Sequence, residues 1–500
     1  MAVLKDANTL GTYLNELLTT KKIDKKYLSM SLDINRTQLY RFLNGEQLPD
    51  IELIHKIAVK LNLRASEYDK LLESYECSAF GVEVIRGRKI VFDLIDRMIH
   101  QNNEEHLGLS YSLEGLSLFP AKEDCRDTQI IPIQGKSRVH HAIYALLDSV
   151  KESGTKIRLL MQPDHEGLEN LLPSLLKYIS DHKVKSSIAH IIRFKDIALD
   201  RNKLYNLNLL DKLLPYSGRD DIYNVFYTIG NYDTLTYDNF FPNIICLGNQ
   251  RALTISADFQ KAIFINNYAT DIVSLMCSEF DKILKDCLPM FTKVSDVFEM
   301  SKLMLEYEAP AKTDTYLLHP EHIFYTFPIT LIEEMTKEHK IPDSITTLFL
   351  KRVDAFRKRL KKNQVYEVIT EAGLDNFVQK GILLIQGGVY FSVNRRIEIL
   401  ENLVEFIENN RNYNLSILRE NHPYADLDSA VYIIDEELLY IVPSYSKFST
   451  TGSIFIRERG IIESFKDFYM SYFTEKNCIT DRKSVADILK DKIRLLRNMQ

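Results

Sequence analysis

The chain has few of the features that mark several large classes of protein. Its six cysteines, at positions 77, 125, 246, 277, 287 and 478, form no C-x-x-C pair. This scatter argues against a zinc ribbon, a disulfide scaffold and a thioredoxin-type site, and it is typical of a reducing cytoplasm. The longest apolar runs, such as Ile382–Ile385 and Leu438–Val442, are far shorter than the ~20 residues of a membrane helix. The first ten residues include Lys5 and Asp6 and no apolar segment, so we expect no signal peptide, no membrane partner and a cytoplasmic protein.

The motifs of the common catalytic sites are also missing. The sequence contains no G-x-x-x-x-G-K-[ST], no G-x-G-x-x-G and no G-x-S-x-G. His319 and His322 have a spacing seen in metal sites, but Pro320 between them makes the backbone irregular, so we interpret the segment as a loop. We therefore predict no catalytic residue, no metal and no cofactor, and we expect that the protein is not an enzyme.

The composition is that of an ordinary folded protein. Apolar residues make up 45% of the 500 residues and charged residues 26%, which is too apolar for a disordered chain. At roughly 100–200 residues per domain, this length predicts about three or four domains. The net charge is −6, so any contact with nucleic acid has to come from a local basic patch.

The first seventy-six residues are dense in helix signals. Apolar residues recur at intervals of three and four, and residues that commonly start or end helices stand between the apolar runs. Asp24 and Asn35 occupy the positions of N-caps. Gly45 follows a predicted helix at the position where glycine commonly adopts the left-handed conformation. The predicted helices are Thr9–Thr20, Lys25–Leu32, Arg36–Asn44, Ile51–Leu63 and Ser66–Tyr75.

The second and third predicted helices form a helix-turn-helix pattern, with a short turn at Asp33-Ile34. Apolar residues on both helices would pack them together: Leu28, Leu32, Ile34, Leu39 and Phe42. With the three flanking helices in order, residues 9–75 resemble the lambda-repressor-like (XRE) family of bacterial and phage DNA-binding domains. The resemblance implies a dimer on a pseudo-palindromic operator in double-stranded DNA. Ser29, Leu43 and Lys25 depart from the residues usual in this family.

The polar edge of the third helix is the predicted DNA-binding surface. Arg36 or Arg41 could pair with guanine and Gln38 with adenine, while Thr37 could meet a thymine methyl group or a phosphate. Residues 21–41 hold six basic side chains against two acidic ones, which suits phosphate contacts. The alternative is a generic helical bundle with a solvated basic loop. The predicted contact residues are Lys25, Asn35, Arg36, Thr37, Gln38, Tyr40 and Arg41.

The rest of the chain alternates strand and helix patterns, which predicts α/β modules. The stretch IICLGNQRALTIS resembles VYIIDEELLYIVP in pattern, and KAIFINNYATDIVSL resembles GSIFIRERGIIESF. We predict two degenerate copies of one module, roughly 130–290 and 395–475, the second lacking the middle strand-helix unit. The alternative is chance similarity of two hairpin-strand-helix segments.

The predicted fold is thus an all-α five-helix domain followed by α/β (or α+β) modules. The predicted parts are a DNA-binding domain 1–76, a linker or dimerisation region 77–129, a sensor module 130–290, a helical connector with a hairpin 291–394 and a smaller module 395–500. In the connector, residues 351–362 hold seven Lys or Arg against one Asp, a run that usually forms a solvated helix face.

The second α/β ending is loosely similar to phospholipase-D-like sensor domains appended to some bacterial regulators. A working phosphodiesterase of that kind needs H-x-K, which occurs nowhere in this sequence. We expect a transcription regulator with an effector-sensing or oligomerising region, and Asp164, His165 and Glu166, after a strand end, are weak candidates for contacting an unidentified effector. The alternatives are a peptide- or protein-responsive regulator and a nucleic-acid-targeted enzyme.

Overall fold

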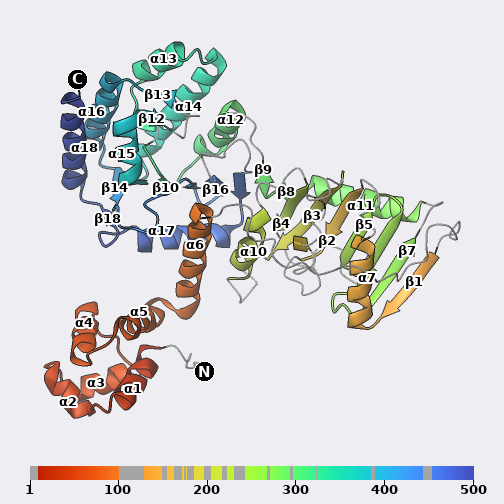
Figure 1. The fold of residues 1–500 in the computed structure, drawn as a ribbon, viewed down its shortest axis with the longest axis horizontal. Coiled ribbons are helices and arrows are strands. Elements are labelled where there is room, and N and C mark those ends of the chain that lie inside the picture. The colour runs from red at the N-terminus through yellow and green to blue at the C-terminus, as the bar shows by residue number, and fades with distance from the viewer. Residues whose placement is uncertain are drawn as a thin grey trace. The chain divides into compact units, whose positions relative to one another are not determined.

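The structure is a computed structural model (Figure 1) and comprises two units, Met1–Phe92 and Asp93–Gln500. It describes residues 9–100, 129–148, 155–162, 172–173, 176, 179, 185–195, 204–216, 222–229, 242–266, 271–292, 297–322, 324–383, 389–442 and 453–499. The boundary between the units falls inside one helix, α6 (Val82–His100).

The N-terminal unit is helical, as the sequence predicts. Its helices before α6 are α1 (Leu10–Thr20), α2 (Lys25–Ser31), α3 (Arg36–Leu43), α4 (Ile51–Lys60) and α5 (Ala65–Phe80). Three of the turns between them have the same form, in which a residue with positive φ ends one helix and an apolar residue then bonds back to the carbonyl five residues earlier. Those positive-φ residues are Lys22 (54°), Asp33 (55°) and Asn62 (48°).

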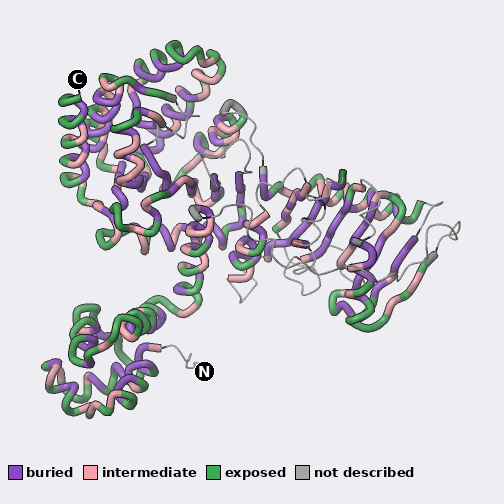
Figure 2. The backbone as a smooth tube through the Cα atoms, viewed as in Figure 1, coloured by how far each residue is buried: buried purple, intermediate pink, exposed green. Residues whose placement is uncertain are grey.

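All five helices contribute to one apolar core, seen as the inward purple segments in Figure 2. Leu14, Leu39 and Ile54 are almost completely buried there, each on a different helix. Because each of these five short helices buries a single apolar stripe, most of its stability comes from packing against the others.

The second unit contains two eight-stranded sheets. The first sheet has the order β1-β7-β6-β5-β2-β3-β4-β8. Its strands are β1 (Gln129–Gln134), β2 (Lys156–Leu160), β3 (Ser187–Phe194), β4 (Tyr223–Ile229), β5 (Asn243–Leu247), β6 (Arg251–Ile255), β7 (Lys261–Asn266) and β8 (Leu288–Pro289). The helices of this region are α7 (Lys136–Asp148), α10 (Tyr205–Leu213) with the 3-10 turn η2 (Leu214–Tyr216), and α11 (Ile272–Lys285).

The second sheet has the order β18-β14-β11-β10-β15-β16-β17-β9. Its strands are β9 (Phe291–Thr292), β10 (Thr315–His319), β11 (Val365–Thr370), β14 (Tyr413–Leu418), β15 (Ala430–Ile434), β16 (Leu438–Val442), β17 (Ser453–Ile456) and β18 (Cys478–Ile479). Its helices are α12 (Val297–Glu308), η4 (Phe324–Thr326), α13 (Ile329–Glu338), α14 (Asp343–Leu360), α15 (Glu371–Lys380), α16 (Val393–Asn409), α17 (Arg459–Tyr472) and α18 (Arg482–Arg497). A separate hairpin pairs β12 (Ile382–Leu383) with β13 (Val389–Tyr390).

The first sheet read from β1 and the second sheet read from β9 have equivalent strands in the same order. Each equivalent pair of neighbours is also either parallel in both sheets or antiparallel in both. In each, three parallel strands (β2, β3 and β4; β10, β11 and β14) are followed by an antiparallel meander on the far side of the first of them. The registers also agree, because Phe264 in β7 and Phe455 in β17 pair with equivalent positions of β6 and β16. The internal repeat predicted from the shared I-F-I is therefore present in the strand order.

The limits of the second copy differ from the prediction. β10 and β11 lie in the segment 291–394, which we expected to be a helical connector, and they form the centre of the second sheet. The second copy thus begins at β9 and does not lack the middle strand-helix unit. The segment Leu288–Thr292 joins the copies, since β8 pairs with β4 of the first sheet and β9 pairs with β17 of the second.

Among the described residues, no helix has both the length and the apolarity needed to cross a lipid bilayer.

Candidate functional site

The turn between α2 and α3 fixes where the predicted contact helix begins. Asp33 adopts a positive φ, and the N–H of Ile34 bonds to the carbonyl of Ser29 at 3.1 Å. The side chain of Asn35 then caps α3, its Oδ1 accepting from the backbone N–H of Gln38 at 2.6 Å. Asn35, predicted to contact DNA, therefore already has a structural role in starting the helix.

The eight residues of α3 divide cleanly into two faces. Leu39, Phe42 and Leu43 are buried in the core of the unit. The opposite edge is exposed or half-exposed, and it carries the predicted contact residues Arg36, Thr37, Gln38, Tyr40 and Arg41. The spacing of apolar residues in the sequence thus identified the outward edge of this helix within the N-terminal unit.

Tyr40 organises two of the predicted cations. The guanidinium carbon of Arg36 lies 5.6 Å from the Tyr40 ring centroid, and Nζ of Lys25 lies 5.4 Å from it. One guanidinium N–H of Arg36 also donates to the Tyr40 hydroxyl at 3.4 Å, a contact that raises the pKa of Arg36. These contacts hold Arg36 and Lys25 beside one aromatic face.

Lys25 is half-buried, and its ammonium donates to Oδ1 of Asn15 on α1 at 3.0 Å. Asn15 in turn donates from Nδ2 to the carbonyls of Gly11 and Leu43, at 2.8 and 3.3 Å. Asn15 was not among the predicted residues, although it connects α1, the start of α2 and the end of α3. Its only signal in the sequence is a polar residue within an otherwise amphipathic helix.

A close approach of α1 to the end of α3 also escaped the sequence analysis. A Cβ on Gly11 would lie 2.5 Å from the carbonyl oxygen of Leu43, which is too short for any real contact. Glycine is therefore required where the two backbones meet. Ser29 is buried, and its hydroxyl donates to the carbonyl of Lys26 at 2.9 Å, so this serine leaves no unpaired donor in the core.

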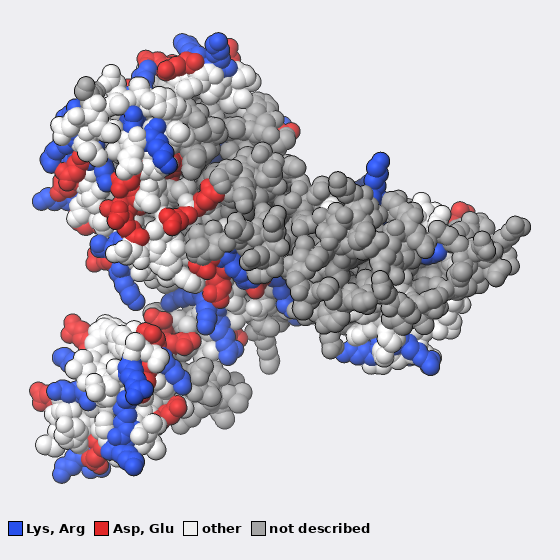
Figure 3. Space-filling view, in the orientation of Figure 1, with Lys and Arg blue, Asp and Glu red and all other residues white. Residues whose placement is uncertain are grey.

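Charge on the N-terminal unit is mixed. Residues 1–76 hold eleven Lys or Arg and eleven Asp or Glu, while the six basic side chains of residues 21–41 face only two acidic ones. In Figure 3 a band of blue side chains crosses the visible face of these helices, with red side chains mostly around it. The positive charge is concentrated around the α2–α3 segment.

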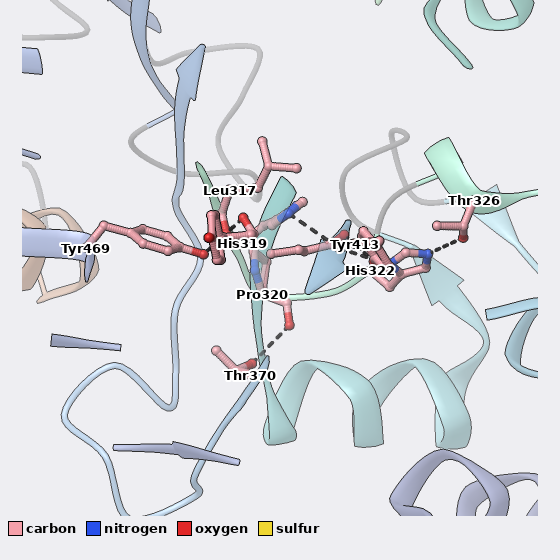
Figure 4. Close-up of polar contacts among 10 residues, drawn as sticks. Leu317, His319, Pro320, His322, Thr326, Thr370, Tyr413 and Tyr469 are labelled. Atoms are coloured by element: carbon pink, nitrogen blue, oxygen red, sulfur yellow. Dashed lines mark hydrogen bonds and ion pairs between the residues drawn. The ribbon is translucent and has the colours of Figure 1, made fainter. Parts of the chain in front are cut away.

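The weak effector candidates Asp164, His165 and Glu166 lie outside the described residues. The segment His319–His322, interpreted as a loop, is more ordered than expected. His319 is the last residue of β10, and both histidines are buried (Figure 4). Each lies within 3.5 Å of the carboxylate of Glu367 of β11. Among the described residues, no group of three or more His, Cys, Asp or Glu has a geometry that could hold a metal ion.

Glu367 is the centre of this buried network. Its Oε1 lies 2.9 Å from Nδ1 of His322, and its Oε2 accepts from the hydroxyl of Tyr413 at 2.5 Å. His322 Nε2 lies 2.6 Å from Oγ1 of Thr326, where the chain turns toward α13. Burial raises the pKa of Glu367, but His322, His319 and Tyr413 oppose this and hold the pKa below its usual value, so the carboxylate is charged.

His319 is the one member without a hydrogen bond. Its Nε2 lies 3.5 Å from Glu367 Oε1, and neither ring nitrogen has a hydrogen-bond partner in the described structure. Burial lowers the pKa of His319 to about 4, although the neighbouring carboxylate of Glu367 opposes this shift. The Tyr469 hydroxyl lies within hydrogen-bond distance of the carbonyls of Leu317 and Tyr366, at 3.0 and 3.1 Å, and so connects α17 to β10 and β11 (Figure 4).

The first sheet holds a matching pair at the same register. Tyr223 and Tyr413 occupy equivalent positions of β4 and β14, and His190 takes the position of Glu367. The Tyr223 hydroxyl lies 2.6 Å from Nδ1 of His190, whose Nε2 lies 2.7 Å from the carbonyl of Met161. Since a carbonyl only accepts, Nε2 carries the proton, and burial lowers the pKa of His190 to about 4.

The basic run of residues 351–362 is divided between the surface and the interior, since Lys351, Lys358, Lys361 and Lys362 are exposed as expected. Arg352 and Arg359 are buried, and Arg352 forms a two-bond pair with the buried carboxylate of Glu308, both bonds 2.8 Å long. The Tyr325 hydroxyl contacts both partners. At least part of this run therefore serves the interior of the second copy and is not available to nucleic acid.

No family model matches this chain, and no curated protein matches it. Among solved structures it is similar to the phosphatidylserine synthase of Haemophilus influenzae Rd KW20, with 8% identity, a TM-score of 0.24, and coverage of 73% of this chain and 93% of that one. It is also similar to a polyphosphate kinase from Porphyromonas gingivalis, with 11% identity, a TM-score of 0.22, and coverage of 74% of this chain and 56% of that one. A third similar structure is that of TrmBL2, an archaeal chromatin protein that shows a novel mode of DNA binding. It has 11% identity, a TM-score of 0.22, and coverage of 51% of this chain and 83% of that one. At these TM-scores none of the three supports an assignment, so what the structure establishes is an N-terminal helical region followed by two mixed α/β sheets.

Proposed function

We propose that the chain is a sequence-specific DNA-binding transcription regulator, in which the N-terminal helices bind a duplex operator and the α/β region senses an effector or joins copies of the chain. The observation that carries this proposal is the exposed polar edge of α3, opposite its buried apolar face. A helix in the major groove reads base edges with its N-terminal residues.

The support around α3 favours a reading role. The helix begins at the Asn35 cap, and Gly11 lets α1 lie against its end, so its position in the unit is fixed from both sides. Arg36 is exposed yet lies against Tyr40, which reduces the freedom lost when its guanidinium meets a guanine. Arg41 is exposed on the next turn.

The proposal includes a dimer on two half-sites. A helix of eight residues spans only about two turns and meets few base pairs. Two copies, with half-sites one helical turn of DNA apart, are the usual way to reach useful specificity. An effector that favours one spacing of the two reading helices would then regulate binding by shifting a population.

The test is selection of binding sites from random duplex DNA with the full chain, followed by titration of the selected duplex. The double variant Arg36→Ala/Arg41→Ala should lose about 1–3 kcal/mol per lost base contact and should no longer enrich a common sequence. The matched control is Lys56→Ala/Lys60→Ala, which removes the same charge from exposed positions of α4.

The control should bind the selected site within a few-fold of the original chain, with the same base preference. Circular dichroism of each variant should show unchanged helix content. Failure of the original chain to enrich any sequence would refute the proposal, as would full retention of sequence preference by Arg36→Ala/Arg41→Ala.

A further inference from the structure

A cavity of about 390 Å³ opens on the second copy between the start of α13, the last turn of α14 and the C-terminal half of α16. Its volume is within the range of small-molecule sites. None of its residues takes part in the predicted DNA surface. The residues that matter to its chemistry are Thr326, Ile329, Arg357, Asn402, Glu405 and Asn410.

One side of the cavity is positive. Arg357 of α14 donates from its guanidinium to the carbonyl of Phe327 at 2.8 Å, and its Nε is buried with no hydrogen-bond partner in the described structure. Phe327 directly precedes Pro328, the N-cap of α13, which no side chain caps. The first bond inside that helix comes from Ile332, so the N–H groups of the first turn are not used within it. Arg357 therefore lies beside the positive end of a helix dipole.

The other side is negative and rich in acceptors. Glu405 is an exposed carboxylate on α16, close to the C-terminal end of that helix. Asn402 and Asn410 use their side-chain N–H groups on the carbonyls of Glu398 and Phe406, at 2.7 and 2.9 Å. This leaves the side-chain oxygen of each amide as a further acceptor.

We propose that this cavity binds a small zwitterion of the amino-acid class, with the carboxylate of the ligand at Arg357 and its ammonium group at Glu405. A simple anion would be repelled by Glu405, and a simple cation by Arg357, so only a ligand with both charges satisfies both sides. A free amino acid and the end of a short peptide share this chemistry. The inference goes beyond the proposed function and does not depend on DNA binding.

The position of Thr326 connects the site to the core. Thr326 lines the cavity, and its hydroxyl contacts His322, which bonds to Glu367 in the middle of β11. A ligand at Arg357 also lies beside the carbonyl of Phe327, the residue after Thr326. Binding thus acts directly on the turn that holds the buried network.

The experiment is ligand-observed NMR titration of the full chain, without DNA, with glycine, acetate, methylamine and triglycine. Arg357→Met and Glu405→Gln remove the two charges. Their matched controls are Lys358→Met, on an exposed neighbour in α14, and Glu408→Gln, on an exposed residue of α16.

Glycine or triglycine should bind the original chain and both controls with similar affinity. The affinity for Arg357→Met and for Glu405→Gln should be about tenfold lower. Acetate should bind Glu405→Gln better than the original chain, a gain that a folding defect cannot produce. Preference for glycine over triglycine assigns the site to free amino acids, and the reverse preference assigns it to peptide ends. Absence of binding by both zwitterions, or equal binding to all variants, would overturn the inference.

Discussion

The buried pair of Glu308 and Arg352 offers the sharpest test of how the second copy is held together. Both side chains are almost inaccessible, and the two bonds between them are 2.8 Å long. Burial raises the pKa of Glu308, but Arg352 and Tyr325 outweigh this and hold the pKa below its usual value, so the carboxylate is ionised. Removing either partner leaves the other charge in the interior without its main balancing group.

Glu308→Gln or Arg352→Met should each lower the free energy of unfolding by about 3–5 kcal/mol, because the remaining charge has lost its partner. The double variant Glu308→Leu/Arg352→Met removes both charges and should recover most of that loss. The exposed pair of Asp354 and Lys358, on the same helix, should contribute only about 0.3–0.5 kcal/mol.

The assay is urea denaturation at pH 7, combined with hydrogen exchange of the α12 and α14 amides measured by mass spectrometry. Exchange assigns the loss to the second copy even if the N-terminal unit unfolds separately. Acid should have the same effect as the single variants, since the contribution of Glu308 is present above its unfolded pKa near 4.5 and is lost as pH falls through its lower folded pKa. The reasoning is wrong if the single variants lose less than about 1 kcal/mol, or if the double variant loses the sum of the two.

Three further changes test separate parts of the structure. Gly373→Ala would place a Cβ 1.8 Å from the carbonyl oxygen of Pro320, so β10 and α15 must move apart, and we expect a loss of about 1–3 kcal/mol in thermal or urea unfolding. Asn35→Ala removes the cap of α3 and should cost the N-terminal unit about 1 kcal/mol, measured by circular dichroism on urea titration, with weaker operator binding as a consequence. The pKa of His319 is about 4 in the folded protein against 6.5 when unfolded, so its burial makes the protein less stable as pH falls from 6.5 toward 4. His319→Leu should therefore flatten the dependence of the unfolding free energy on pH in this range. An unchanged dependence would contradict the assigned burial effect.

The first four N-terminal helices could be predicted closely because their signals are local, whereas the fifth, predicted to end at Tyr75, continues to Phe80. Asp24, Asn35 and Asp50 each cap a helix through a side-chain oxygen, and a cap can be recognised from a few neighbouring residues. The outward edge of α3 followed from the spacing of its apolar residues. The roles of Gly11 and Asn15 could not be predicted, because both depend on which parts of α1 and α3 come together in three dimensions.

The missed strands have a different cause. β11 has the sequence VYEVIT, rich in residues that favour strands, yet Glu367 in its middle breaks the apolar run expected of a buried parallel strand. β10 is only five residues long and ends at the two-histidine segment that we interpreted as a loop. Glu367 is buried because its partners, such as Tyr413, lie far along the chain, so no local window of the sequence contains the reason for its burial.

The basic run in α14 shows the same limit. Local counting treats the seven cations of residues 351–362 alike, five of them in α14, and the usual outcome for such a run is a solvated face. Arg352 is internal because Glu308 lies 44 residues earlier, and Arg357 turns inward because it meets the carbonyl of Phe327. A run of like charges can thus supply a buried ion pair and one side of a cavity from a single helix.

The two copies also differ in a way that bears on the proposed sensing role. In the first, His190 is neutral and has a hydrogen bond at each ring nitrogen, so its position needs no further support. In the second, the equivalent Glu367 is charged and needs donors that the three parallel strands do not fully supply. The segment between β10 and β11 provides one through His322, and the same segment contains α13 and α14, two of the three helices around the cavity. Because one segment both supplies a donor to the buried charge and contributes two of the three helices around the cavity, we expect a ligand that moves its turn to change the electrostatics of the second sheet, and we expect the proposed effector to bind this copy.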